Sequence, residues 1–161
     1  GAAAAEGVKV DSMKSGKVLD ALKTGKVKAL YLMGENPLDP EKKVEGIESA
    51  LKQCDFIVVQ DISLNETAKL ADVVLPADSF AEADGTFTNM EGRVQRIRKA
   101  VQAPGVSLAD GKILGMLLQL LGVDTGFQSA EDVFRAMCNE MSAYKGMSYE
   151  TLQKEGSVQI G

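Results

Sequence analysis

Apolar residues in the first half of the chain occur as short continuous runs separated by helical patterns. The runs are Ala29–Met33, Phe56–Val59 and Val73–Leu75. A continuous apolar run bounded by turn residues is typical of a strand buried on both faces, as in a parallel sheet. Since helical patterns lie between the runs, we predict right-handed crossovers and a parallel sheet.

Helical periodicity and capping residues define the remaining elements. Asp39, Ser129 and Ser148 are the expected N-terminal caps, and Gly25 and Gly122 end their helices. The expected helices are Ser15–Lys23, Pro40–Gln53, Glu66–Leu70, Ala109–Leu121, a helix after Ser129, and Ser148–Lys154. Their expected core-facing residues are Val18, Leu19, Leu22, Val44, Ile47, Leu51, Val133, Phe134, Met137 and Met141.

The segment between the third apolar run and the long helix has a different pattern. A loop follows Pro76, and Gly85 opens a short β segment that Glu91 and Gly92 turn back into Arg93–Arg98. Alternation along that strand places Arg96 and Arg98 on one face. An alternative interpretation is a solvated edge strand, whose charges deter aggregation.

Together these patterns predict an α/β fold. We expect a Rossmann-like, mostly parallel sheet flanked by helices, with a β-hairpin-like excursion near residues 85–98. The expected organisation is a flexible lead-in over residues 1–14, one domain over 15–155 and a tail over 156–161.

Composition excludes several classes of function. The chain has 161 residues, and its net charge of -5 argues against a general nucleic-acid binder. No apolar stretch reaches the ~18 residues of a membrane span, so we expect no direct membrane insertion. The start lacks the basic and apolar regions of a signal peptide, which predicts a cytoplasmic protein. It also lacks an initiator Met, so we expect a fragment or a processed chain.

The residue types exclude much catalytic chemistry as well. The chain has no histidine, which removes Ser-His-Asp triads and His metal sites. Cys54 and Cys138 lie far apart and are too few for an iron–sulfur cluster, so we interpret them as buried thiols. The loop carboxylates Asp78, Glu82 and Asp84 match no calcium loop and predict a solvated loop. We therefore expect no catalytic and no metal-ligating residue, and interpret Met116, Met137, Met141 and Met147 as core filler.

The ends of the predicted strands are the candidate binding site. Ligands of open parallel sheets bind at the carboxyl ends of the strands. Gly34 allows close backbone approach, Asn36 offers donors and an acceptor, and Asp61 can accept the N–H pair of a guanine. The alternative is that Asn36 and Pro37 form only a turn and that Asp61 only caps the next one. No G-x-G-x-x-G or Walker phosphate loop is present.

Several blocks, in one order, resemble the molybdopterin oxidoreductase superfamily. They are G-E-N-P (34–37), V-V-Q-D-I (58–62), E-T-A (66–68), A-D-V-V-L-P-A (71–77), G-T-F-T-N (85–89) and E-G-R-V-Q (91–95). The resemblance continues weakly through Ser129–Leu152 and covers most of the chain after about residue 15. The chain looks like the third domain of this superfamily, which includes formate dehydrogenases, periplasmic nitrate reductases and one subunit of NADH–quinone oxidoreductase (complex I).

The resemblance implies a site for one nucleotide arm of bis-molybdopterin guanine dinucleotide. The implied cofactor contacts are Asn36, Gln60, Asp61 and Asp110. It also implies a longer parent subunit, because the iron–sulfur module and the segment that ligates the metal are absent from this chain. The implied partners are the other parent domains and other redox subunits, and we expect no turnover by the chain alone.

Two positions divide the family's members. Ala83 stands where a lysine usually follows the loop glutamate, and Gly92 gives E-G-R-V-Q where formate dehydrogenases tend to have E-R-R-V-Q. Both features resemble the complex I member of the superfamily. In that member the domain is a structural remnant that lacks the cofactor. The resemblance also implies a location peripheral to the inner membrane, through the complex. Our main interpretation is therefore a structural domain of such an NADH dehydrogenase subunit. It would support electron transfer from NADH through iron–sulfur clusters held elsewhere. The alternative is the cofactor-binding domain of a formate dehydrogenase-like molybdenum or tungsten enzyme.

Overall fold

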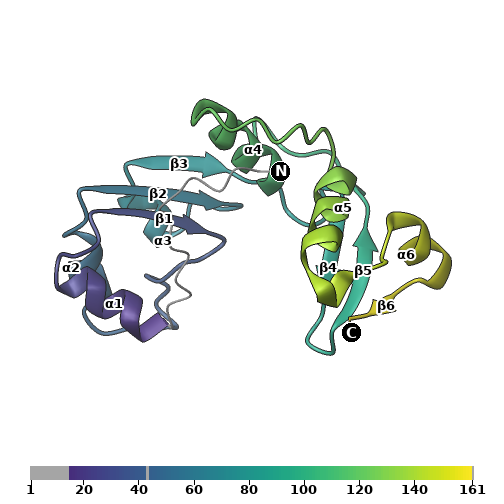
Figure 1. The fold of residues 1–161 in the computed structure, drawn as a ribbon. Coiled ribbons are helices and arrows are strands. Elements are labelled where there is room, and N and C mark those ends of the chain that lie inside the picture. The colour runs from purple at the N-terminus through teal and green to yellow at the C-terminus, as the bar shows by residue number, and fades with distance from the viewer. Residues whose placement is uncertain (1–14, 43, 161) are drawn as a thin grey trace. The chain divides into compact units, whose positions relative to one another are not determined.

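The computed structural model describes residues 15–42 and 44–160, and its contacts divide the chain into two compact units, residues 1–76 and 77–161. The predicted lead-in, residues 1–14, lies outside the described residues. The elements are shown in Figure 1. In the first unit they are α1 (Ser15–Lys23), β1 (Ala29–Met33), α2 (Ile47–Leu51), β2 (Phe56–Asp61), α3 (Glu66–Leu70) and β3 (Val73–Pro76). In the second they are β4 (Gly85–Thr88), β5 (Arg93–Ile97), α4 (Asp110–Leu120), α5 (Ala130–Glu140), the 3₁₀ helix η1 (Ser142–Tyr144), α6 (Tyr149–Glu155) and β6 (Val158–Gln159).

A parallel sheet of order β1-β2-β3 organises the first unit, as the apolar runs predict. The pairing places Leu30 beside Ile57 and Leu32 beside Val59. These side chains face the helices, and the two on β2 are only 2% and 0% exposed. Together with residues of all three helices they form one apolar core, which contains Leu22, Ala50, Leu51, Ile57, Val59 and Ala68.

The opposite face of this sheet carries no helix from the described residues of the first unit, which corrects one prediction. Tyr31 and Met33 of β1 are 39% and 47% exposed, so this strand is not buried on both faces. The reason is topological. Both crossovers advance in the same direction across the sheet, and right-handed connections then place their helices on the same face. Figure 1 shows α1 and α2 below the three strands.

The predicted helix over Pro40–Gln53 is also wrong in its first half, because α2 begins only at Ile47. Asp39 does not cap a helix. Its carboxylate accepts a hydrogen bond from the backbone N–H of Glu41, two residues further on, at 2.9 Å, and this bond stabilises a turn. The preceding loop is tied to α3, since the backbone N–H of Leu38 donates to Thr67 Oγ1 at 3.1 Å. Val44, expected to face the core, is 40% exposed.

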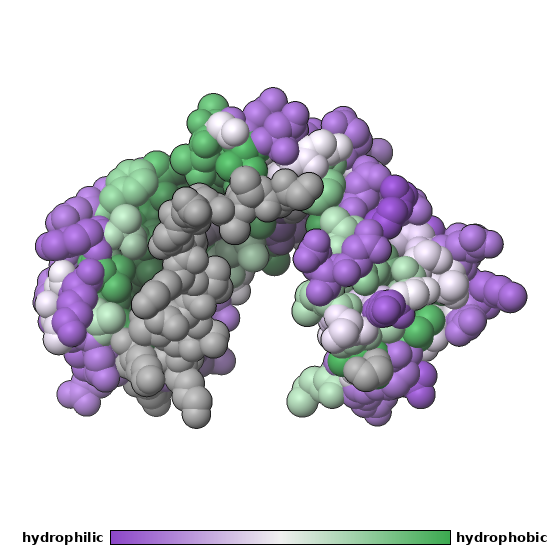
Figure 2. Space-filling view, viewed as in Figure 1, coloured by the Kyte–Doolittle hydropathy of each residue, from purple (hydrophilic) through white to green (hydrophobic). Residues whose placement is uncertain are grey.

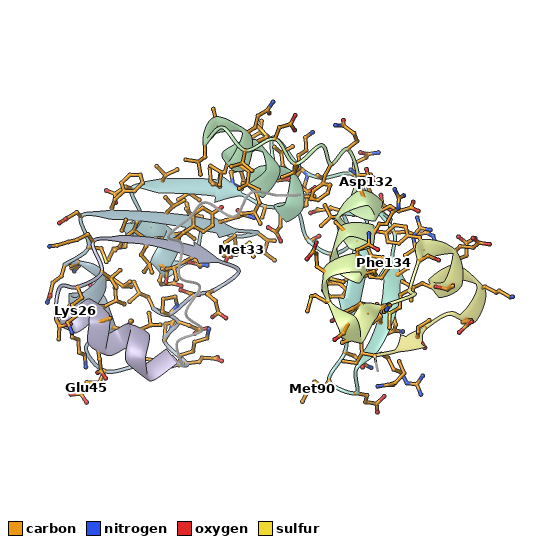
Figure 3. All side chains as sticks on the ribbon, in the orientation of Figure 1. Lys26, Met33, Glu45, Met90, Asp132 and Phe134 are labelled. Carbon is orange, nitrogen blue, oxygen red and sulfur yellow. The ribbon has the colours of Figure 1, made fainter. Side chains whose placement is uncertain are left out.

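The second unit is built on an antiparallel sheet of order β4-β5-β6. The β4–β5 hairpin confirms the predicted excursion, and Figure 3 shows Met90 at its tip. Strand β6, which the sequence pattern did not reveal, pairs with Arg93 and Val94. β5 is therefore the middle strand over this part of its length rather than an edge. The unit has its own apolar core, formed by Val94, Phe134, Cys138, Tyr149 and Leu152.

The helix caps of the second unit confirm their predictions. Ser129 Oγ accepts from the backbone N–H of Asp132 at 3.2 Å at the start of α5. Ser148 and Thr151 form a reciprocal capping box at the start of α6. Both caps satisfy backbone donors that the first turn of a helix leaves unpaired.

The predicted inner faces of these helices are only partly right. Phe134 is buried and Met137 packs against the core, but Val133 and Met141 are 44% and 48% exposed. Met141 lies at the cap of α5, where the helix has already ended. Helix α4 forms as predicted, but Met116 is half exposed, so it is not core filler.

The fold as a whole is the predicted α/β class, with a parallel sheet flanked by helices and a hairpin-based second sheet. Within residues 15–42 and 44–160, no helix has both the length and the apolar character that crossing a bilayer requires.

Gly92 gives a test of how the second sheet closes. Its φ of +78° is disfavoured for residues with a Cβ, and an added Cβ would lie 2.8 Å from Gln159 Nε2 and 2.9 Å from Ile160 Cγ1. We expect Gly92→Ala to destabilise the chain by about 1–2 kcal/mol for the backbone, with roughly 1 kcal/mol or more added by overpacking. Urea unfolding monitored by circular dichroism measures this loss.

Gly146→Ala is the matched control. Gly146 has a φ of +82° and no atom within 4 Å of an added Cβ, so only the backbone contribution applies. Equal losses in the two variants would show that the packing of β6 on Gly92 contributes nothing.

Candidate functional site

The carboxyl ends of β1 and β2 bring three of the four predicted cofactor contacts to one edge of the first sheet. Asn36 follows β1, while Gln60 and Asp61 end β2. Gly34, which directly follows β1, has a φ of +64°. Its backbone N–H donates to the carbonyl of Gln60 at 2.9 Å. The fourth, Asp110, lies in the first turn of α4 in the second unit.

The amide of Asn36 is held by the start of α3. Its Oδ1 accepts from Thr67 Oγ1 at 2.6 Å and from the Thr67 backbone N–H at 3.3 Å. Its Nδ2 donates to Glu66 Oε2 at 3.4 Å, a long and exposed contact. Because the oxygen is engaged, Asn36 presents its N–H₂ group as the part able to reach a ligand.

Thr67 is the residue that orients this amide. It is fully buried, and its hydroxyl also accepts from the backbone N–H of Leu38. Sequence reasoning placed Thr67 only within the E-T-A block and gave it no role. The only sequence signal for this role is a threonine in the first turn of a short helix that begins soon after a strand ends.

Asp61 has the turn-capping role that the alternative interpretation gave it. Its Oδ1 accepts from the Ser63 backbone N–H at 3.1 Å and from Ser63 Oγ at 3.4 Å. Its Oδ2 accepts from Asn65 Nδ2 at 3.1 Å. Asn65 in turn caps α3 through Ala68, so the carboxylate and the helix start are one bonded unit.

A carboxylate has about four lone-pair sites, so these bonds leave acceptor capacity on Asp61. Its neighbours Ile62 and Leu64 are 67% and 64% exposed. The edge therefore combines an amide donor, an anionic acceptor and two exposed apolar side chains. That combination suits a flat, polar-edged heterocycle.

Gln60 is placed differently from its neighbours. Its side chain is fully buried, and its Oε1 accepts from the hydroxyl of Tyr31 on β1. Direct contact between this side chain and a ligand requires that it first become exposed. The cofactor role of Gln60 stays a prediction, as do those of Asn36, Asp61 and Asp110.

The acidic loop of the second unit is organised by its own hydrogen bonds. Glu82 Oε2 accepts from the backbone N–H of Ser79 at 2.7 Å, which makes the carboxylate part of the loop. The backbone N–H of Asp78 donates to the carbonyl of Leu108 at 3.0 Å, beside a bridge between Ala77 and Leu108. In the part of the chain that the structure describes, no three His, Cys, Asp or Glu residues are grouped so as to hold a metal ion.

Arg96 of β5 and Arg98, just after its end, contact α6. Arg96 and Arg98 both donate to Gln153 Oε1, at 3.5 and 3.3 Å, which confirms that they share a face. The guanidinium of Arg96 lies 4.2 Å from the centre of the Tyr149 ring. Burial raises the pKa of Tyr149. The charge of Arg96 lowers this pKa, whereas the charges of Asp84 and Glu131 raise it further. Because Tyr149 belongs to the core of the second unit, Arg96 packs against the edge of that core.

Cys138 is buried as predicted, but Cys54 is only partly buried, which corrects the prediction for that thiol. Burial raises the pKa of Cys138. The pKa of Cys54 is also raised, mainly by burial and to a smaller extent by the negative charge of Asp55. A raised pKa keeps the thiol protonated at neutral pH and lowers its nucleophilicity. The Cys54 thiol contacts the carbonyl of Val27 at 3.8 Å.

Comparison with known proteins assigns this chain to a family of oxidoreductases. Residues 2–120 match the molybdopterin oxidoreductase family, and the chain belongs to that family. It is 52% identical over 132 residues to F420-dependent formate dehydrogenase 2 subunit alpha of Methanococcus maripaludis, covering 81% of this chain and 20% of that protein. It is 51% identical over 132 residues, with the same coverage, to the F420-dependent formate dehydrogenase subunit alpha of Methanocaldococcus jannaschii.

A solved structure shares the fold. Acetylene hydratase from Pelobacter acetylenicus superposes with a TM-score of 0.67 at 22% identity, over 89% of this chain and 20% of that one. The chain spans about a fifth of the length of the curated relatives it matches.

Thr67→Val tests whether α3 holds Asn36. Valine keeps the shape but removes the hydroxyl that donates to Asn36 and accepts from Leu38, leaving buried groups unpaired. We expect a loss of about 1–3 kcal/mol in the free energy of unfolding. Thr88→Val is the control, because the Thr88 hydroxyl bonds Tyr144 at an exposed position and its loss should change stability by no more than about 0.5 kcal/mol. Equal effects would argue against a buried network at Thr67.

Proposed function

We propose that this chain is the cofactor-nucleotide domain of the α subunit of a formate dehydrogenase-type molybdopterin oxidoreductase. The observation that carries the proposal is the 52% identity, over 81% of the chain, to the α subunit of a formate dehydrogenase. The proposed cofactor is bis-molybdopterin guanine dinucleotide with molybdenum or tungsten. The domain corresponds to the third domain of the superfamily.

The strand-end edge offers the donors and acceptors that such a cofactor requires. Asn36 Nδ2 is a donor whose orientation Thr67 fixes, and Asp61 is an acceptor for the ring and amino N–H groups of a guanine. Ile62 and Leu64 supply apolar contact beside them. The bound cofactor would supply the metal centre of the redox reaction, while these residues bind and orient its nucleotide. Gln60 and Asp110 are further proposed contacts.

The complex I interpretation is less well supported than this alternative. The two relatives described above are formate dehydrogenase α subunits, and the structure gives a separate reason for glycine at position 92. Its φ of +78° and its contact with β6 favour glycine whether or not a cofactor binds. Of the two positions that favoured complex I, only Ala83 still lacks a structural explanation.

The remaining properties belong to the parent protein. We propose that other domains of the parent subunit hold an iron–sulfur cluster and supply the metal ligand, and that other redox subunits accept the electrons. The 161-residue chain alone is then not expected to turn over. A cytoplasmic location is proposed with it.

The proposal is tested on the full-length parent subunit. We expect stoichiometric molybdenum or tungsten by mass spectrometry and guanine nucleotide released on acid hydrolysis. Asp61→Asn should reduce the retained nucleotide about tenfold or more, since hydrogen bonds to a charged group contribute about 1.5–3 kcal/mol. Asparagine keeps the side-chain oxygen that caps Ser63, but its N–H₂ group replaces the oxygen that accepts from Asn65 Nδ2, so circular dichroism must show that the variant is folded.

Asp39→Asn is the matched control. Asp39 also caps a turn, but in the loop before α2. We expect it to leave the nucleotide content unchanged. Metal-free parent protein that still joins an NADH-oxidising assembly would contradict the proposal and favour the complex I interpretation.

A further inference from the structure

The carboxylate of Asp61 is held at both of its oxygens. Its Oδ1 accepts from the backbone N–H of Ser63 at 3.1 Å, and its Oδ2 accepts from Asn65 Nδ2 at 3.1 Å. The torsion that sets the plane of a carboxylate has only a broad preference of its own. The bond at Oδ1 alone therefore leaves the direction of the second oxygen undetermined, and the bond from Asn65 fixes it.

The amide of Asn65 is itself held in one orientation. Its Oδ1 accepts from the backbone N–H of Ala68 at 2.9 Å, while its Nδ2 donates to Asp61. A flipped amide would place its oxygen against the carboxylate and its N–H₂ group against a backbone donor, and both bonds would be lost. The two partners of Asn65 thus determine which atom faces Asp61.

The element behind Asn65 is anchored in the core of the first unit. Asn65 caps α3, and Ala68 in the first turn of that helix is 2% exposed and belongs to the apolar core. Packing and hydrogen bonds therefore connect the core to the Asp61 carboxylate through Ala68 and Asn65. A hydrogen bond to an ionised group is also stronger than one between neutral groups.

We propose that Asn65 is a positioning residue for the nucleotide site. It holds the Asp61 carboxylate in one orientation, so that this side chain does not have to be ordered when it accepts from the guanine. The inference rests on the proposed function, which makes Asp61 the acceptor. It adds the residue through which α3 sets that acceptor. The competing interpretation is that Asn65 serves only as a helix cap.

Asn65→Ser separates the two roles. Serine caps a helix about as well as asparagine, but it has no N–H₂ group to donate to Asp61. The variant is made in the full-length parent subunit, purified with its cofactor, and the nucleotide that remains is measured after dilution. We expect the nucleotide to be lost about three- to tenfold faster than from the wild-type subunit, because a side chain that is no longer held must be ordered on binding.

A double-variant comparison shows whether Asn65 acts through Asp61. In the Asp61→Asn background, Asn65→Ser should speed the loss by less than about twofold, since the group that it positions is already changed. Effects that multiply would mean that the two residues act independently, and they would overturn the inference. An Asn65→Ser subunit that retains its nucleotide as the wild type does would overturn it as well.

Ser129→Asn is the matched control. It exchanges the same two cap residues in the opposite sense at the start of α5, where Ser129 Oγ accepts from the backbone N–H of Asp132 at 3.2 Å. Figure 3 labels Asp132, and Figure 2 shows hydrophilic side chains over this end of the helix. We expect no change in nucleotide loss. A change as large as that of Asn65→Ser would assign the effect to helix capping in general and overturn the positioning role.

A measurement without cofactor separates this inference from the proposed function. NMR couplings of the Asp61 β-protons in the 161-residue chain should show one side-chain rotamer in the wild type and several in Asn65→Ser. One rotamer in both chains overturns the positioning role, whatever the subunit binds. If the rotamers change but the wild-type full-length subunit holds no nucleotide, the proposed function alone is overturned.

Discussion

The structure of the first unit depends on burying one face of the central strand β2. Ile57 and Val59 belong to one apolar core that also contains residues of all three helices. The parallel order of the strands requires crossovers, and the crossovers require their helices to lie on one face. Among the described residues of the first unit, the same constraint therefore leaves the opposite face of the sheet without a helix.

The candidate site is a product of the same crossovers. They bring the loop after β1 and the start of α3 to the edge where β2 ends. There the helix start uses Thr67 to orient Asn36 and Asn65 to bond Asp61. Each of these polar groups first satisfies a loop or a helix cap, and Asp61 keeps some acceptor capacity beyond those bonds. Structural and binding roles share the same side chains, because short loops at strand ends have few residues to divide between them.

Gly92 shows how a family difference can have a local cause. In the sequence, E-G-R-V-Q was one of the two features that suggested the complex I member of the superfamily. In the folded chain Gly92 lies against Gln159 and Ile160, in a conformation that glycine adopts at little cost. The contact joins segments far apart in the chain, as the bond from Gln159 Nε2 to the Glu91 carbonyl does across 68 positions. A substitution that looks functional in a motif is here accounted for by the packing of a short strand.

The elements that could be predicted from the sequence are those whose signals are local. Apolar runs gave the strands β1 to β3, serine caps gave the starts of α5 and α6, and the block order gave the family. Only the tertiary structure decided which face of each strand is covered, which atom of Asn36 is engaged, and that β6 pairs with β5. The physical reason is that an apolar run looks the same whether one face or both are covered. The helix expected from Pro40 begins only at Ile47. The residues just before Pro40 are held by a tertiary hydrogen bond, from the Leu38 N–H to a threonine 29 residues away, which local sequence patterns do not reveal.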